Sequence, residues 1–214
     1  MHSIYFQDLN ENYVPEILKE IYVDRIYAPF LNNRKNLVVV DAGANLGLTS
    51  FYFKDFAKVV YAIEPAQMHR ECLSSLIVEN KIDNIKILPY ALSDKSGKTK
   101  LYHSPNITAH SMIPDATGSR DDYEEVETIT LDYILRQTNI DHIDFLKLDV
   151  EGMESQIVTS PGFAQISPKI NTIVGEYHDW GFASKDFFRG TLQSLGFHFS
   201  WIPNMEADMF TCVK

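Results

Sequence analysis

The sequence contains little cysteine. Two cysteines, Cys72 and Cys212, occur among 214 residues, and they lie far apart. This spacing excludes a disulfide framework and the closely spaced thiol ligands of a structural zinc site. We therefore expect two packed, unpaired thiols in a protein of a reducing compartment.

Positive charge is also scarce. Lys and Arg number 19 against 29 Asp and Glu, so the formal net charge is -10 and the pI is about 5.1. Binding to a phosphate backbone depends on clustered Lys and Arg, so this composition argues against nucleic acid as a partner.

Long apolar runs are missing as well. No run approaches the ~18 apolar residues of a membrane span. The N-terminus lacks the basic segment and the apolar core of a signal peptide. These absences predict a chain without a membrane span, soluble and cytoplasmic.

Short Val/Ile/Leu-rich runs alternate with helical patterns from Leu37 onward. The predicted strands are Leu37–Gly43, Lys58–Pro65, Ile85–Leu92, Ile143–Val150 and Ile170–His178. Near-continuous apolar strands separated by helices are typical of a parallel sheet covered on both faces. The right-handed crossover rule then favours a doubly wound α/β fold, with one domain as the prior for this length.

Two regions interrupt this alternation. Residues 1–36 predict a helix or two laid over the core. Two strand-like stretches within residues 97–130 flank a polar loop at about 104–123, which we interpret either as a binding loop or lid or as plain surface disorder. Tyr102, His103 and His110 in this region are candidates for substrate contact, although exposed loop positions are the preferred reading. After Trp180 the pattern predicts a helix and then a C-terminal strand pair.

A glycine-rich turn, "DAGANLG", follows the first predicted strand. Its glycines let the backbone approach a ligand closely, and Glu64, 23 positions after Asp41, ends the second strand where a carboxylate can bind ribose hydroxyls. The turn lacks the G-x-G-x-x-G of dinucleotide sites, and Asp41 would repel a pyrophosphate. It favours S-adenosylmethionine over NAD. An NAD-dependent oxidoreductase, a non-catalytic cofactor-binding module and a turn without ligand remain alternatives.

Charged side chains end two later strands. Lys147 and Asp149 share a face of one strand and Glu151 follows them, while Glu176 and His178 end the next. These five are the candidate catalytic residues. His178 is a candidate general base, the carboxylates could orient an acceptor, or the set could bind Mg2+, although we assign no metal ligand. Glu154 is read as a solvated helix position.

Several motifs together resemble one family. "VVVDAGANLG", "YAIEP", "ALSDKSG", "ITLDYIL", "DFLKLDVEGME" and "IVGEYH" occur in the order seen in FkbM-type methyltransferases, which are class I S-adenosylmethionine-dependent enzymes. The resemblance covers roughly residues 37 to 197. It implies a methyltransferase domain over 37–214, preceded by an extension over 1–36. It also implies a seven-stranded, mostly parallel sheet with helices on both faces and an antiparallel C-terminal strand.

The resemblance also implies roles for particular residues. The residues around the methionine moiety of the cofactor would be Asp41, Gly43, Ala44, Asn45 and Gly47. Glu64 would bind the ribose, and Ala91, Leu92 and Ser93 would line the adenine. The implied reaction is O-methylation of a small-molecule, glycan or lipid-linked hydroxyl, with S-adenosylhomocysteine as product.

Overall fold

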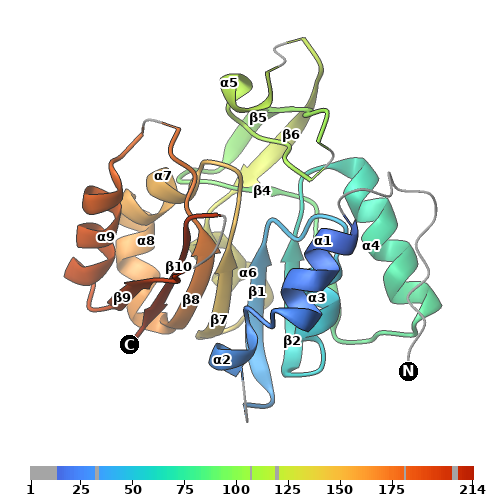
Figure 1. Cartoon of the computed structure of the whole chain (residues 1–214), viewed down its shortest axis with the longest axis horizontal. Coiled ribbons are helices and arrows are strands. Elements are labelled where there is room, and N and C mark those ends of the chain that lie inside the picture. The colour runs from blue at the N-terminus through green and yellow to red at the C-terminus, as the bar shows by residue number, and fades with distance from the viewer. Residues whose placement is uncertain (1–13, 32–33, 107, 119–120, 181, 204–206) are drawn as a thin grey trace.

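The computed structural model describes residues 14–31, 34–106, 108–118, 121–180, 182–203 and 207–214. Its main sheet has seven strands in the order β3-β2-β1-β7-β8-β10-β9 (Figure 1). Neighbouring strands are parallel from β3 to β8, and β10 lies antiparallel between β8 and β9. The strands are β1 (Leu37–Ala42), β2 (Ala57–Ile63), β3 (Ile85–Leu88), β7 (Ile143–Leu148), β8 (Ile170–Glu176), β9 (His198–Trp201) and β10 (Met209–Val213). The predicted fold class is confirmed.

Helices cover both faces of this sheet because its strands are apolar on both sides. Along β1, Val38 and Val40 pack in one core cluster, whereas Val39 between them packs in the other. The first cluster includes side chains of α6 (Leu131–Thr138), α7 (Glu154–Thr159), α8 (Pro161–Ile166) and α9 (Lys185–Ser194). The second includes side chains of α3 (Leu48–Phe53) and α4 (Gln67–Glu79). A 3-10 turn, Ser167–Lys169, leads from α8 into β8.

The N-terminal residues that the structure describes pack on the same face as α3. They form α1 (Val14–Leu18), a π-helical turn (Lys19–Val23) and α2 (Ala28–Leu31), and they bury Ile21, Tyr27 and Leu31 in the second cluster. Residues 1–13 of the predicted extension lie outside the described residues, so the division of the chain at residue 36 stays a prediction.

The predicted strand Ile85–Leu92 is wrong as a single element. β3 ends at Leu88, and Ala91–Leu92 is a separate strand, β4, in a second sheet of order β4-β6-β5. Pro89 separates the two because it has no N–H to donate to a ladder. β5 (Gly97–Tyr102) and β6 (Tyr123–Ile129) are the two strand-like stretches that flank the polar loop.

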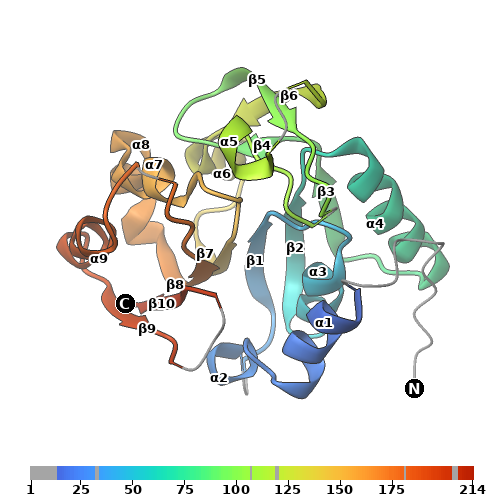
Figure 2. The same ribbon diagram turned by 45° about the horizontal axis from the view of Figure 1, so that its top comes forward.

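The small sheet lies over the carboxyl ends of the main-sheet strands, together with α5 (Pro114–Thr117) from the polar loop (Figure 2). Residues 107, 119 and 120 of that loop lie outside the described residues. Ligands of open α/β sheets bind at this edge, near the point where the strand order reverses. Here that point lies between β1 and β7.

Two further expectations concern the whole chain. Cys72 and Cys212 are both unpaired, half-buried and buried respectively, as expected. Within the ranges that the structure describes, no helix has the length and apolar character needed to cross a membrane.

Candidate active site

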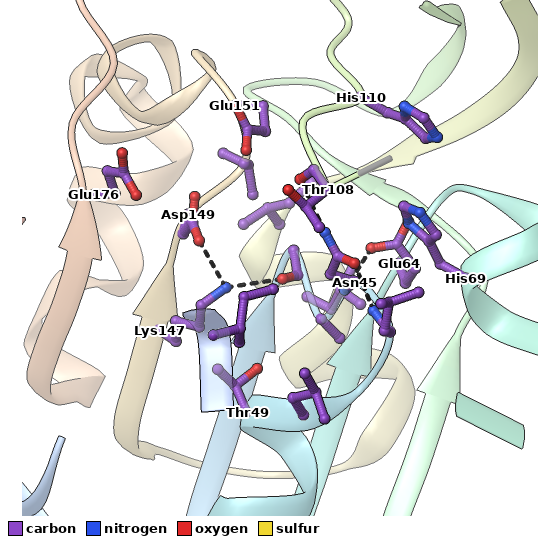
Figure 3. Close-up of a pocket in the computed structure, with 18 of the residues that line it drawn as sticks. Asn45, Thr49, Glu64, His69, Thr108, His110, Lys147, Asp149, Glu151 and Glu176 are labelled. Carbon is purple, nitrogen blue, oxygen red and sulfur yellow. Dashed lines mark hydrogen bonds and ion pairs between the residues drawn. The ribbon is translucent and has the colours of Figure 1, made fainter. Parts of the chain in front are cut away.

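A cavity of about 240 Å³ opens at the carboxyl ends of β1, β2, β7 and β8 (Figure 3). Its wall includes six of the predicted cofactor residues, namely Gly43, Ala44, Asn45, Glu64, Ala91 and Leu92. It also includes four of the predicted catalytic residues, namely Lys147, Asp149, Glu151 and Glu176. Among the described residues, four further predicted ones lie outside this wall: Asp41, Gly47, Ser93 and His178.

The glycine-rich turn is shaped by residues with positive φ. Gly43 has φ +78°, and a Cβ there would lie 1.8 Å from the backbone oxygen of Asp149. The turn after β1 and the end of β7 therefore touch backbone to backbone, which requires glycine. Gly47, with φ +90°, faces Leu73 of α4, where a Cβ would lie 2.3 Å from a methyl carbon. Gly47 thus serves helix packing rather than the cavity wall.

Asp41 is not part of the cavity wall, and its side chain lies between α3 and Lys147. Its Oδ2 accepts hydrogen bonds from Thr49 Oγ1 at 2.7 Å and Ser50 Oγ at 2.6 Å, and the residue is fully buried. Burial raises the pKa of this carboxyl, while Lys147, 3.7 Å from Oδ1, acts in the opposite direction. Asp41 thereby ties β1 to the first turn of α3.

Lys147 connects the two strands on either side of the switch point. Its Nζ donates to the carbonyl oxygen of Gly43 at 2.8 Å and pairs with Asp149 Oδ2 at 3.0 Å. Burial alone would lower the pKa of Lys147, but Asp149 and Asp41 outweigh it and raise the pKa. The ammonium therefore stays charged and fixes both the turn and Asp149.

Glu64 follows β2 directly, is almost completely buried, and accepts one backbone hydrogen bond on each carboxylate oxygen. Its Oε2 accepts from the N–H of Asn45 and its Oε1 from the N–H of Ala66, both at 2.8 Å. His69 Nδ1 lies 3.3 Å from the same Oε1. These contacts fix the carboxylate plane at the cavity wall.

Ser93 belongs to the small sheet and lies just beyond the wall formed by Ala91 and Leu92. It is buried, its N–H donates to the carbonyl of Ile129 at 2.8 Å, and its hydroxyl donates to Asp94 Oδ1 at 3.0 Å. Ala91 and Leu92 of β4 therefore line the cavity, whereas Ser93, directly after β4, is hydrogen-bonded to the end of β6.

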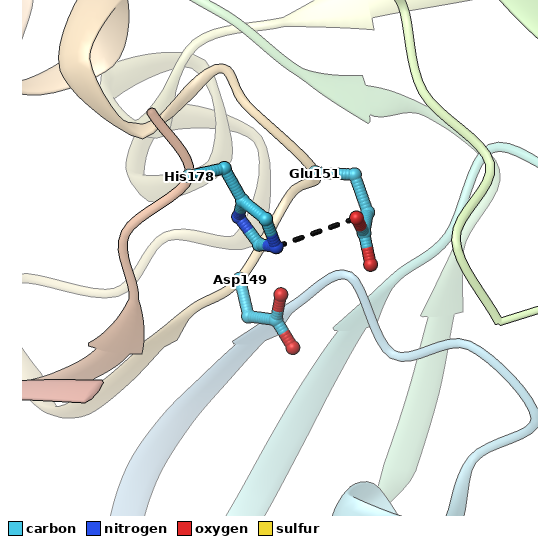
Figure 4. Close-up of side chains that lie close together, drawn as sticks. All are labelled: Asp149, Glu151 and His178. Carbon is cyan, nitrogen blue, oxygen red and sulfur yellow. Dashed lines mark ion pairs between the residues drawn. The ribbon is translucent and has the colours of Figure 1, made fainter. Parts of the chain in front are cut away.

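An imidazole lies among acids at the ends of β7 and β8 (Figure 4). His178 Nε2 is 3.4 Å from Glu151 Oε2 and also 3.4 Å from Glu176 Oε1. Ligand-type atoms of Asp149, Glu151 and His178 all lie within 4.8 Å of one another. The five predicted catalytic residues are thus brought together, with His178 behind Glu151 and Glu176 rather than in the wall itself.

The acids and the imidazole shift one another's proton affinity. Burial and then the charge of Asp149 raise the pKa of Glu151 to about 8 and the pKa of Glu176 to about 7. Burial alone would lower the pKa of His178, but its contact with Glu154 and the charges of Glu154, Asp149 and Glu151 raise it to about 10. His178 is therefore an imidazolium at neutral pH, and its role as a general base is not supported.

Glu154, which the sequence places on a solvated helix face, is completely buried. Its Oε1 accepts from the N–H of Val150 at 2.9 Å, and its Oε2 accepts from the N–H of Gly152 at 3.1 Å. His178 Nδ1 lies 3.2 Å from Oε1. The reading as a solvated position is wrong, because the turn between β7 and α7 folds back onto this carboxylate.

Sequence reasoning missed part of the wall. Thr108 and Met112 come from the polar loop, His69 comes from the first turn of α4, and Glu20 and Tyr27 come from the N-terminal segment. His110 of the same loop, for which an exposed position is the preferred reading of the sequence, is instead half-buried in the wall. Asn45 Nδ2 donates to the carbonyl of Thr108 at 2.9 Å, so the loop touches the glycine-rich turn. No local pattern marks these residues, because tertiary contacts bring them to the cavity.

Comparison with known proteins identifies a family for most of the chain. Residues 41–199 match the model of the Methyltransferase FkbM domain. Methyltransferase sdnD of Sordaria araneosa is 31% identical over 176 residues, which cover 66% of this chain and 66% of that protein. The 31-O-demethyl-FK506 methyltransferase FkbM of Streptomyces tacrolimicus is 26% identical over 194 residues, covering 76% and 74% of the two chains.

Solved structures share the fold. The Methyltransferase FkbM from Methylobacillus flagellatus KT superposes with a TM-score of 0.60 at 16% identity and covers 87% of this chain, which in turn spans 46% of that one. The magnesium protoporphyrin IX methyltransferase from Synechocystis PCC 6803, solved with bound SAM, gives a TM-score of 0.57 at 11% identity, with 97% and 86% of the two chains covered. The chain belongs to the FkbM methyltransferase family and has the fold of S-adenosylmethionine-dependent methyltransferases.

Proposed function

We propose that the protein transfers a methyl group from S-adenosylmethionine to a hydroxyl oxygen of a small-molecule, glycan or lipid-linked acceptor. The observation that carries the proposal is that one cavity joins two different sites. Glu64 stands at one end with backbone-fixed oxygens, and the group of Asp149, Glu151 and Glu176 stands at the other. The first end can bind the ribose of a nucleoside cofactor, and the second can bind an acceptor hydroxyl that must lose a proton.

The residues at the first end fit the cofactor. A carboxylate has about four acceptor positions, and Glu64 uses two on Oε1 and one on Oε2 within the protein. Oε2 therefore has capacity for a ribose hydroxyl. Ala91 and Leu92 give an apolar wall for adenine, and Gly43 to Asn45 leave room for the methionine end. The family favours this cofactor over the nicotinamide alternative.

The second end fits a hydroxyl acceptor. When bound, the cofactor supplies a methyl group that its sulfonium charge activates for transfer. The protein must orient the hydroxyl, exclude water and receive the proton, and a positioned base is typically worth about 10²–10⁴-fold. Glu176, with a pKa of about 7, is the preferred base, since its proton affinity matches neutral conditions. Asp149, paired with Lys147, is the preferred residue for orienting the hydroxyl.

A divalent cation such as Mg2+ is not needed to balance these acids. The imidazolium of His178 already lies between Glu151 and Glu176, and Glu154 orients it from behind. We therefore derive no step through a metal. Methyl transfer measured with added Mg2+ and with a chelator tests this point, and equal rates are expected.

Oxygen as the acceptor atom draws support from a relative. The Streptomyces tacrolimicus protein is named for an O-demethyl substrate, so its name describes methylation of an oxygen. Both relatives are named as methyltransferases, which favours an enzyme over a non-catalytic binding module.

Calorimetric titration with S-adenosylhomocysteine tests the cofactor site. The wild type is expected to bind, and Glu64→Ala to lose more than tenfold in affinity (over about 1.4 kcal/mol). Glu79→Ala, at an exposed position at the end of α4, is the matched control and should bind like the wild type. Absence of binding by the wild type would overturn the proposed function.

Acceptor chemistry needs a second measurement. Formation of S-adenosylhomocysteine is followed with pools of hydroxyl-bearing, amine-bearing and thiol-bearing compounds. Turnover confined to the hydroxyl pool supports O-methylation. Tight cofactor binding without turnover in any pool would favour the non-catalytic module.

A further inference from the structure

Histidines gather beside Glu64, at the end of the cavity opposite the catalytic acids. His69 lies in the first turn of α4, and His110 lies in the polar loop (Figure 3). Their rings stack with centroids 4.9 Å apart and planes 4° from parallel. His103, just after β5, also contacts His110, with centroids 5.0 Å apart and the planes tilted by 48°. Both His69 and His110 are part of the cavity wall.

His69 is held by Glu64 on one side only. A carboxylate accepts hydrogen bonds and does not donate them, so the Nδ1 atom 3.3 Å from Glu64 Oε1 carries the hydrogen. The residue is 1% exposed, and its Nε2 has no hydrogen-bond partner among the described residues. A buried polar atom without a partner is costly. The contact with Glu64 and the place of the ring in the cavity wall point to a role in holding that carboxylate.

His69 occupies an acceptor position on Oε1 of Glu64, and this leaves Oε2 as the oxygen that can accept a hydrogen bond from a ligand. The N–H groups of Ala66 and His69 both reach Oε1, whereas the N–H of Asn45 alone reaches Oε2. Together they fix the rotation of the carboxylate and leave Oε2 with room to accept. Without His69, the Ala66 N–H would be the remaining donor to Oε1.

The polar loop contacts His69 and Asn45, two residues that contact Glu64. The N–H of Ser104 donates to His110 Nδ1 at 3.0 Å, so His110 accepts there and carries its hydrogen on Nε2. The pKa of His110 is lowered to about 4 by burial and by the neighbouring His69 and His103, so the ring is neutral in the stack. The carbonyl of Thr108 accepts from Asn45 Nδ2. The loop thus touches both residues that flank Glu64.

We propose that His69 is a positioning residue for Glu64, and that the polar loop, through the stack of His110 on His69, forms part of the cofactor pocket. The inference rests on the proposed function, because the ligand of Glu64 is taken to be the ribose of S-adenosylmethionine. His110 is therefore expected to affect cofactor affinity, because its ring stacks on His69 and His69 contacts Glu64.

Calorimetric titration with S-adenosylhomocysteine tests the inference on three variants. His69→Leu removes the N–H and should weaken binding at least tenfold. His69→Asn keeps an N–H at the position of Nδ1 and should stay within about threefold of the wild type. His110→Leu should weaken binding less than His69→Leu. His198→Leu, at an exposed position of β9, is the control and should have no effect.

A double-mutant cycle separates positioning from general structural damage. His69→Leu should have little further effect once Glu64→Gln is present, because its effect passes through the carboxylate. His69→Gln, with its N–H moved outward, replaces His69→Leu if the latter does not fold. Wild-type affinity in His69→Leu, or an equal loss with and without Glu64, would overturn the inference. Absence of binding by the wild type would instead overturn the proposed function, and this inference with it.

Discussion

The Nδ1 atom of His178 lies 3.2 Å from Oε1 of Glu154, and this contact joins the end of β8 to the beginning of α7. Glu154 is 0% exposed and also accepts from the N–H groups of Val150 and Gly152. One buried carboxylate therefore shapes the turn that carries Asp149 and Glu151 and fixes the imidazolium behind them.

Glu154→Ala is expected to lower the free energy of unfolding by about 3 kcal/mol. The change leaves two backbone N–H groups and the Nδ1 atom of the His178 imidazolium without their acceptor. Loss of one partner of a buried pair is strongly destabilising. Urea denaturation measures the effect. Glu79→Ala, which removes an exposed carboxylate, should stay within about 0.5 kcal/mol of the wild type. Equal losses in the two variants would contradict the buried role of Glu154.

Stability is expected to fall as the pH rises from about 6 to about 9. The pKa values of Glu151 and Glu176 are raised from 4.5 to about 8 and about 7, and that of His178 is raised from 6.5 to about 10. The folded chain therefore binds more protons than the unfolded chain in this window, and each extra proton is worth about 1.4 kcal/mol per pH unit.

The sign follows group by group. The contribution of His178 is fully present below pH 6.5 and is lost as the pH rises through about 10. Glu176 and Glu151 become charged in the folded chain as the pH rises through about 7 and about 8, and their buried charges then lower the stability. Urea denaturation at several pH values checks this. The combined variant Glu151→Gln, Glu176→Gln should show a flatter profile, and a slope as steep as that of the wild type would refute the assignment.

Glu176→Gln is expected to lower kcat by about 100-fold or more, within the range of about 10²–10⁴ for a lost general base. In the wild type, kcat/KM for the acceptor should rise with a pKa near 7 as the carboxyl of Glu176 loses its proton, because this parameter reports the free enzyme. The variant should lack this acidic limb. The pH profile of kcat/KM for the acceptor is the measurement, with Glu79→Gln as control. A variant that keeps the limb would move the base to another group.

The main sheet could be predicted because each parallel strand is a continuous apolar run. The side chains of Leu37 to Val40 pack alternately in the two core clusters, as expected for a strand that is covered on both faces. The positions of Glu64 and Asp149 followed from the same strands, since their carboxyl ends meet at one edge. Pro89 carried the signal that divides the third predicted strand, because it lacks an N–H.

Other features depend on contacts that the sequence does not mark. Asp41 faces Thr49 and Ser50 under α3, and only the packing of that helix decides this. His69 and His110 are 41 positions apart, and their stack depends on how the polar loop crosses the cavity. A short-range pattern describes periodicity within one element, so it cannot place a loop against a distant helix.

Two glycines of the C-terminal half are expected to respond to alanine in opposite directions. A Cβ at Gly175 in β8 would lie 2.0 Å from the carbonyl oxygen of Leu148 and 2.9 Å from the ring of Phe210. Gly175→Ala should therefore cost about 1–3 kcal/mol of unfolding free energy, the usual range for overpacking. Gly190 is exposed in α9, and a Cβ there would meet none of the described residues within 4 Å.

Gly190→Ala should stabilise the chain by about 0.5–1 kcal/mol, because alanine loses less backbone entropy than glycine in a helix. Thermal and urea denaturation of both variants measure the pair under one set of conditions. Because β8 lies next to β7, a shift at Gly175 should also reach Leu148 and the adjoining Asp149. Gly175→Ala is therefore expected to lower kcat while Gly190→Ala leaves it unchanged, and equal activity in the two would argue against a rigid connection between these strands.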